Sequence, residues 1–466
     1  MKGVVVKFFI FIAFSSLLFS CGDDIPNTNV NNNTQNLIDS LPNHRPIDQY
    51  AKFISGFSAE DFSDFQQKDI YKSYSNSNET NWNYFSVNQL LVIMNWAEKN
   101  AVSSADDTST VFYPFAGPDF TFAYAFYPYA KNYILIGLEN IGEIPDLKQY
   151  SDLEIAELLN SMTDALVEFY TQGYFSTLNM KYNFRKNNVN GVVHPLLYFV
   201  YRTNNQMIDF EYFVLDEFGQ PQKVDKLESL DKRIKGLKIS MTGKFGNKDL
   251  YYLQVDLSDE NFDDYPELIA FVSSFGNKNT FLKSASYLLQ DNKLLKFRDL
   301  LISQSSKIIQ DDSGFGYNFL KSHNFDVKVF GNYSRTLNLF QDFWQPDLKA
   351  EFDNQNAKKL PFRFGYNVPF DETAIIFAQS QTSEQLQYPI YKVQFRMSWE
   401  KLPVDSFPNN FKEIDYYFDE GYYKYTLGSF QTEDECREML DFVRKNGYQD
   451  AFIVEFKKES RRTINN

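Results

Sequence analysis

Helix-start signals alternate with strand-like runs along most of this chain. Ser151-Asp-Leu-Glu154 is a capping box, in which serine and glutamate side chains bond free backbone N–H groups in a helix's first turn. It predicts a helix that runs to about residue 170. Strand-like apolar runs lie at 133–138, 196–201, 208–215, 237–242 and 250–257. The alternation predicts a mixed α+β body over residues 50–380, folded as one large domain.

A second capping box and further periodic segments extend this prediction. Ser86-Val-Asn-Gln89 predicts another helix start. Its apolar face would hold Val87, Leu90, Leu91 and Met94. Helical periodicity also covers roughly 260–274, 279–290 and 293–309. The runs 196–203 and 207–215 meet at Asn204-Asn205, a turn dipeptide, and predict a hairpin.

The first 20 residues carry the marks of an export signal. Lys2 and Lys7 accompany an uncharged apolar run at 8–19, which is shorter than the roughly 20 apolar residues of a membrane-spanning helix. Ser20 then stands directly before Cys21. This ending resembles the bacterial lipobox, and the resemblance implies cleavage before Cys21 and acylation of that cysteine. The alternative is an ordinary signal peptide followed by a chance cysteine.

Residues 21–48 predict a disordered tether. Asn, Asp, Thr and Pro dominate them, so few apolar side chains are available for a core. Asp23 and Asp24 resemble the surface-export signal of Bacteroidetes lipoproteins, and a solvated tether facing the periplasm is the alternative. We expect the chain in the cell envelope, held at the outer membrane by its lipid, on the periplasmic face rather than the cell surface.

Charge and residue usage exclude several partners. The net charge is −15 and no basic cluster interrupts it, so we expect no nucleic-acid binding, which needs a basic face. If Cys21 is acylated, Cys436 is the only other cysteine and no internal disulfide can form. The three histidines, one of them His194 in an expected turn before Pro195, lack metal-binding spacing. We therefore expect no metal and no cofactor.

The tail beyond about residue 388 has the most regular pattern. Tyr391–Met397 alternates as a strand, and Asp415–Phe418 and Tyr422–Leu427 predict a hairpin. A third capping box, Thr432-Glu-Asp-Glu435, opens a helix that Asn446-Gly447 ends. A last strand follows at 451–456.

The segment from the hairpin to the last strand is similar to the second half of a SPOR domain. Such domains have a strand ending in Gly-x-Phe, then a helix, then Gly-Tyr and a closing strand, as in Gly428-Ser-Phe430 and Gly447-Tyr448 here. The resemblance covers residues 388–457 and implies a β(α)ββαβ fold that binds peptidoglycan glycan strands. The first half departs from the family pattern at Arg396–Pro403, where a small-Gly-Phe turn and a first helix are usual.

Strand parity selects the candidate glycan-binding residues of the tail. Alternation places one set of polar side chains on the sheet face away from the predicted helix. They are Lys392, Gln394, Arg396, Lys424 and Thr426. These side chains could bond sugar hydroxyls, or they could be the ordinary water-facing side of a sheet.

Two stretches of the body are candidates for chemistry. Asp311 and Asp312 could form an acidic site, as in glycosidases with two carboxyls, or an ordinary helix-to-turn segment. The aromatic stretch 113–127 predicts a buried strand face, with a sugar platform as the alternative. We identify no catalytic residue. The leading hypothesis is a non-enzymatic, lipid-anchored envelope protein whose tail binds glycan; the alternatives are an envelope hydrolase using body carboxylates and a surface-exposed interaction lipoprotein.

Overall fold

The computed structural model confirms the mixed α+β prediction, with one large sheet in the body and a smaller one in the tail. The structure describes residues 45–105, 109–175, 190–227, 233–262, 265–276, 278–366, 372–381, 390–400, 402–403, 406–408, 410–411, 414–419, 422–430, 432–456 and 461–464. Among these residues, no helix combines the length and the apolar character needed to cross a bilayer.

Ten strands of the described body form one sheet, in the order β4-β3-β5-β6-β2-β1-β7-β8-β10-β9. The five central strands, β6 to β8 in that order, are mutually parallel, and the outer pairings are antiparallel. The strands are β1 Thr110–Pro114, β2 Asn132–Gly137, β3 Gln206–Leu215, β4 Pro221–Val224, β5 Lys235–Gly243, β6 Gly246–Gln254, β7 Lys278–Leu282, β8 Ser305–Gln310, β9 Phe325–Gly331 and β10 Ala374–Ser380.

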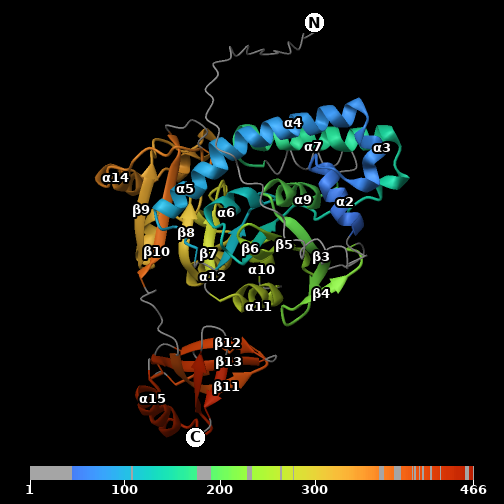
Figure 1. Cartoon of the computed structure of the whole chain (residues 1–466). Coiled ribbons are helices and arrows are strands. Elements are labelled where there is room, and N and C mark those ends of the chain that lie inside the picture. The colour runs from blue at the N-terminus through green and yellow to red at the C-terminus, as the bar shows by residue number, and fades with distance from the viewer. Residues whose placement is uncertain are drawn as a thin grey trace. The chain divides into compact units, whose positions relative to one another are not determined.

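Helices cover both faces of this sheet (Figure 1). The N-terminal helices pack on one face: α2 Arg45–Ile54, α3 Ser63–Gln66, α4 Asp69–Phe85, α5 Leu91–Lys99, α6 Phe120–Phe126, α7 Asp152–Gln172 and α9 Val193–Arg202. The later helices pack on the other: α10 Asp259–Phe262, α11 Pro266–Ser274, α12 Leu295–Ser303, α13 Tyr317–Ser322 and α14 Pro346–Asn354. Because both faces are covered, the central strand β2 is apolar along most of its length, and Tyr133 to Ile136 are all fully buried.

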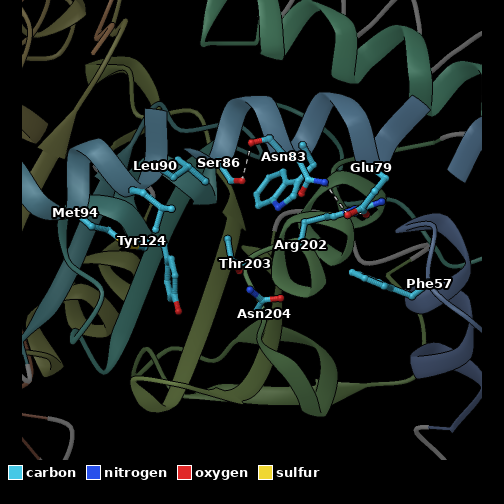
Figure 2. Close-up of a pocket in the computed structure, with 12 residues that line it drawn as sticks. Phe57, Glu79, Asn83, Ser86, Leu90, Met94, Tyr124, Arg202, Thr203 and Asn204 are labelled. Atoms are coloured by element: carbon cyan, nitrogen blue, oxygen red, sulfur yellow. Dashed lines mark hydrogen bonds and ion pairs between the residues drawn. The ribbon is translucent and has the colours of Figure 1, made fainter. Parts of the chain in front are cut away.

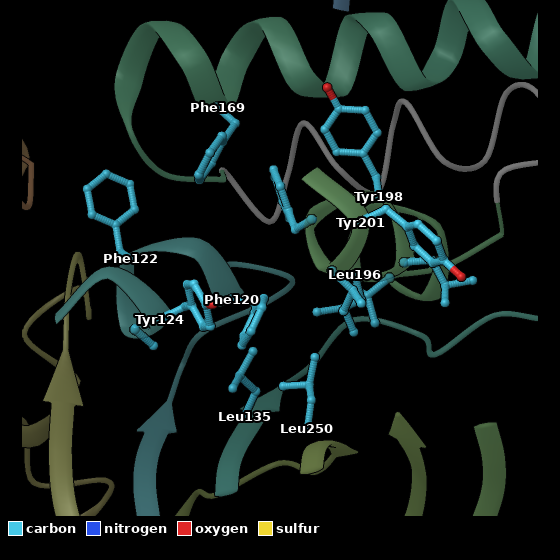
Figure 3. Close-up of a cluster of buried hydrophobic side chains, with 14 of the residues drawn as sticks. Phe120, Phe122, Tyr124, Leu135, Phe169, Leu196, Tyr198, Tyr201 and Leu250 are labelled. Carbon is cyan, nitrogen blue, oxygen red and sulfur yellow. The ribbon is translucent and has the colours of Figure 1, made fainter. Parts of the chain in front are cut away.

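The aromatic stretch after β1 is a buried helix, and the predictions of a strand face and of a sugar platform were both wrong. Every residue of α6 is buried. Figure 3 shows Phe120 close to Leu135 and Leu250 of the sheet, with Tyr198 and Phe169 above it. The alternating aromatics misled the strand prediction because a helix buried on all sides carries apolar residues at every position.

The two body capping boxes had different outcomes. Ser151 caps α7 as predicted, with the reciprocal Glu154 bond present. Ser86 does not begin a helix, because α4 continues through a π-helical segment, Ser86–Leu90, into α5. Of the predicted apolar face, Leu90 is buried, whereas Val87 and Leu91 are exposed. The extra residue of a π-turn shifts the helical phase, so a face drawn at regular spacing is displaced.

Several other element assignments were wrong. The run 196–201 is helix α9, so the predicted hairpin across Asn204-Asn205 does not exist. The segment 279–290 begins with strand β7, and 293–309 is a helix followed by β8. Periodicity cannot separate a short buried helix from a buried strand, and α9 and β7 are buried throughout. The predicted tether to residue 48 also ends early, because α2 begins at Arg45.

The tail has its own five-stranded sheet, in the order β12-β13-β11-β14-β15, with every pairing antiparallel. Its strands are β11 Ile390–Ser398, β12 Ile414–Asp419, β13 Tyr422–Phe430, β14 Phe452–Phe456 and β15 Arg461–Ile464. Two crossover connections interleave, β11 to β12 around β13 and β13 to β14 around β11, which is the split β-α-β arrangement. β15 extends this sheet beyond the predicted elements.

The capping box at Thr432 opens helix α15, Glu433–Lys445, as predicted. Cys436, Leu440 and Val443 face a small core shared with β11, β13 and β14. Phe407 and Phe411, from the connection between β11 and β12, pack into the same core. The tail core therefore contains residues of the tail alone.

Candidate functional site

Three neighbouring strands end at one edge of the body sheet, where the direction of strand addition reverses. From β1 the chain adds β2 and then β6 on one side, and later adds β7 and β8 on the other. In parallel sheets, ligands bind outside the carboxyl ends of the strands at such a reversal. Asp119 follows β1, Lys283 follows β7, and Asp311 follows β8. We call these residues, with Asp312, the carboxyl-edge cluster.

Asp119 and Lys283 form a fully buried ion pair in this cluster. Their Oδ2 and Nζ atoms are 2.7 Å apart, and the two side chains are 2% and 1% exposed. Asp119 also accepts a hydrogen bond from the Tyr113 hydroxyl and caps α6 through the backbone N–H of Phe122. Lys283 donates to the backbone carbonyl of Gly173, at 2.6 Å. Each charge therefore has several partners.

Asp311 and Asp312 follow strand β8 and are both 1% exposed, which corrects the expectation of a helix-to-turn segment. Asp311 accepts hydrogen bonds from the backbone N–H groups of Ser284 and Ser313, at 3.0 and 3.1 Å. Asp312 accepts one from the Tyr287 hydroxyl, while its Oδ1 atom has no partner. The two carboxyl groups are thus core residues of the edge.

Burial changes the acidity of this carboxyl pair. It raises the pKa of Asp312 to about 7, with the neighbouring Asp311 carboxylate adding to the effect. It also raises the pKa of Asp311, against the opposing hydrogen bonds from Ser313 and Ser284. A buried carboxyl group that titrates near neutral pH is suited to general acid or base catalysis when substrate can reach it.

The backbone around the cluster is strained. Phe115, Ser284, Ser286 and Tyr287 have φ between 53° and 62°, in turns that follow β1 and β7. Each such residue costs on the order of 1–3 kcal/mol, and such strain gathers at functional sites. At Gly365 (φ +70°) a Cβ atom would lie 2.1 Å from Oδ2 of Asp311. The backbone at Gly365 therefore lies directly against the Asp311 carboxylate.

The edge has the groups of an acid–base site without access to it. The hydrolase alternative required Asp311 or Asp312 to meet a distant carboxylate in a cleft. Asp119 does lie in the same cluster, where Lys283 interacts with both Asp119 and Asp311, but all these side chains are shielded from solvent. In the described residues, no three His, Cys, Asp or Glu side chains are placed to hold a metal ion.

The predicted glycan-binding residues of the tail are only partly brought together. Gln394 and Thr426 are register partners on one face, but both are buried. Lys392 and Lys424 are half-buried, and Arg396 is exposed. A β-bulge between Gln394 and Arg396 pairs Arg396 with Tyr425, a residue of the helix-packed face. The prediction that Arg396 shares the face of Gln394 was wrong, because one extra residue reverses side-chain direction beyond it.

The same bulge brings an aromatic pair to the predicted face. Beyond it, Met397 pairs with Lys424. Trp399 lies against Tyr422, with ring centroids 3.8 Å apart. Trp399 is 70% and Met397 53% exposed. We call Trp399, Tyr422, Met397 and Lys424 the Trp399 patch. Sequence parity missed it because regular alternation places 397 and 399 inward.

A pocket of about 250 Å³ lies among the N-terminal helices that cover one face of the body sheet (Figure 2). Its lining combines Arg202 and Glu79 with apolar side chains, among them Phe57 and Trp82. The assignment of 196–201 as a strand hid this site, although Arg202 ends a strongly apolar run and a charge there demands a partner. His194, expected in a turn, is instead buried in α9, where its Nδ1 is 2.6 Å from the Tyr50 hydroxyl.

The predicted lipid site, Cys21, lies outside the described residues. The same is true of the signal segment 1–20 and of the tether as far as residue 44. These assignments remain predictions from the sequence.

Comparisons with known proteins add no relative. The chain matches no protein-family model, no curated protein and no solved structure. The similarity of the tail to SPOR domains therefore remains a prediction based on its residues.

Proposed function

We propose that this chain is a lipid-anchored envelope protein whose tail binds the glycan strands of peptidoglycan. Cys21 would carry the lipid and the tail sheet would carry the glycan site. The proposal keeps the chain at the outer membrane, with its tail facing the wall from the periplasm.

The observation that carries this proposal is the Trp399 patch on a split β-α-β sheet. Trp399 is 70% exposed and lies against Tyr422. The axial C–H face of a sugar ring is apolar and packs on the electron-rich face of an aromatic ring. Lys424, the register partner of Met397, places an ammonium group on the same face. An exposed tryptophan on the same sheet face as a lysine suits a ligand with apolar faces and polar edges.

Sedimentation of the purified full chain with peptidoglycan sacculi tests the proposal. Two kinds of sacculi are compared, intact ones and ones whose stem peptides an amidase has removed. We expect retention on both, because the proposed ligand is the glycan. Retention that disappears when the peptides are removed would contradict a glycan site.

Trp399→Ala locates the site. We expect about tenfold weaker retention or more, the effect of removing a central aromatic contact. Tyr84→Ala is the matched control, since Tyr84 is a 74% exposed aromatic residue of the body helix α4. Equal retention of the two variants would place the glycan site elsewhere.

The lipid anchor has a separate test. Cys21→Ala removes the proposed acylation site, and we expect the chain to leave the membrane fraction for the soluble fraction of the envelope. Metabolic labelling with a fatty-acid analogue should mark the original chain and not the variant. A labelled variant would overturn the anchor and leave the glycan site unaffected.

A further inference from the structure

Arg202 is a nearly buried cation with unused hydrogen-bond donors. Its side chain is 2% exposed, and its Nη1 atom pairs with a Glu79 carboxylate that is 54% exposed. Nε and Nη2 have no hydrogen-bond partner. The Phe57 and Tyr198 rings lie 4.8 and 5.6 Å from the guanidinium carbon and contribute cation–π contacts.

The unused donors form the edge of the guanidinium that matches an anion. Nε–H and the adjacent Nη2–H point in nearly parallel directions, the geometry that binds both oxygens of a carboxylate. A buried donor left without an acceptor lowers the stability of the fold. The unpaired donors of Arg202 therefore lower it. A ligand that supplies two acceptors would remove this cost.

The pocket beside Arg202 is shaped by two irregular backbone segments. Ser86 and Leu90 line it from the π-helical segment that joins α4 to α5, and π-segments often occur at functional sites. Asn204 lines it from the turn after α9, where its φ is +58°. Both irregularities face one cavity, which favours a built site over a packing defect.

The rest of the lining combines apolar side chains with uncharged polar ones. Trp82, Leu90, Met94 and Tyr124 contribute aromatic and aliphatic surface, as seen in Figure 2 for the labelled members. Arg202 and Glu79 are the charged members of the lining. The cavity volume of about 250 Å³ suits a ligand the size of a small aromatic acid and is below the range of drug-sized sites.

We propose that this pocket binds a small carboxylate with an aromatic or branched apolar group. The carboxylate would bond Arg202 and the apolar group would lie against Trp82 and Leu90. Glu79 competes for the same guanidinium, so it would weaken binding and allow release. The proposal is independent of glycan binding by the tail.

Calorimetric titration of the purified full chain with phenylacetate tests the proposal, with phenylacetamide and acetate as comparison ligands. We expect phenylacetate to bind about tenfold or more tightly than either, because it alone combines the charge with the apolar group. Equal binding of phenylacetate and phenylacetamide would overturn the role of the charge. Equal binding of phenylacetate and acetate would overturn the role of the pocket.

Three variants and a control locate the binding. Arg202→Met should weaken phenylacetate binding about 10- to 100-fold. Arg202→Lys should weaken it less, since the positive charge remains although the paired N–H donors of the guanidinium are lost. Glu79→Gln should tighten it severalfold by removing the competing carboxylate. Arg335→Met, which removes an exposed arginine paired with Glu372, should leave it unchanged. If neither the original chain nor Glu79→Gln binds phenylacetate at about 10 mM, far above a 1 mM Kd, the proposal is wrong.

Discussion

The carboxyl-edge cluster and the Arg202 pocket both bury a cation, but they treat it in opposite ways. Lys283 is 1% exposed, its partner Asp119 is 2% exposed, and both have further polar partners. Arg202 is equally buried, but its partner Glu79 is half in water and two of its nitrogen atoms have no acceptor. The first arrangement is complete within the protein, whereas the second leaves bonds for another molecule to make.

This difference separates structural charge from binding capacity. A buried charge in itself does not mark a functional site, because its bonding capacity can be satisfied within the protein, as that of Lys283 is. The carboxyl edge lies where parallel sheets bind ligands, but its own side chains and strained turns fill that place. The pocket lies among the N-terminal helices, and Arg202 in its lining keeps two nitrogen donors without an acceptor. Function is better inferred from unmet bonding capacity than from position in the fold.

The largest expected effect comes from breaking the complete pair. Lys283→Met leaves Asp119 buried without its counter-charge and removes the donor to the Gly173 carbonyl. We expect a loss of about 3–5 kcal/mol in the free energy of unfolding, measured by urea denaturation with circular dichroism. Arg335→Met, at an exposed pair, should cost less than about 1 kcal/mol. Similar costs for the two variants would show that the cluster does not depend on this pair.

A second effect depends on pH. Since burial raises the pKa of Asp312 from 3.8 to about 7, the folded chain holds a proton that the unfolded chain loses. This carboxyl group therefore lowers stability progressively as the pH rises from about 4 to about 7.

Asp312→Asn should remove that loss while still accepting the Tyr287 hydrogen bond. We compare the free energy of unfolding of the variant with that of the original chain. The difference between them should shift in favour of the variant by up to about 4 kcal/mol from acid pH to above neutral pH. Urea midpoints across this pH range measure the difference. A constant difference between the two chains would mean that Asp312 does not titrate there.

The smallest expected effect tests the other side of the comparison. Arg202→Met removes two unsatisfied donors and releases a Glu79 side chain that is already half exposed. We expect the free energy of unfolding to change by about 1 kcal/mol or less. A cost as large as that of Lys283→Met would show that Arg202 serves the fold, and the contrast between the two sites would be lost.

The sequence predicted the tail better than the body. In the tail, the β11 alternation, the hairpin and the Thr432 capping box are local signals, and the structure contains all the elements they predicted. In the body, every residue of α6 and α9 is buried, so their sequences lack the polar stripe that distinguishes a helix from a strand. Strand β7 is equally buried although it begins with Lys278, Asn279 and Thr280, a polar start that does not indicate a core strand. The predicted α+β class was correct because it required only that both kinds of element be present.

The site residues were hidden for a related reason. Asp119 is the single charge in a long apolar stretch, which predicts that a buried charge has a partner but not which one. Lys283 follows Lys278, Asn279 and Thr280 and precedes Ser284, so the sequence does not mark it as buried. Their pairing depends on β7 lying beside β1, a tertiary fact that no local pattern contains. Trp399 was missed because a bulge has no sequence marker here, and regular alternation was the natural assumption.

The bulge in β11 also determines how this tail should be aligned with other chains. A related strand without the extra residue needs a one-residue gap near Phe395 before its outward side chains match Met397 and Trp399. An ungapped alignment would compare each outward residue beyond that point with an inward one and score a shared surface as unrelated. The surface that this tail shares with a related sheet is therefore matched only when the gap falls inside the first strand.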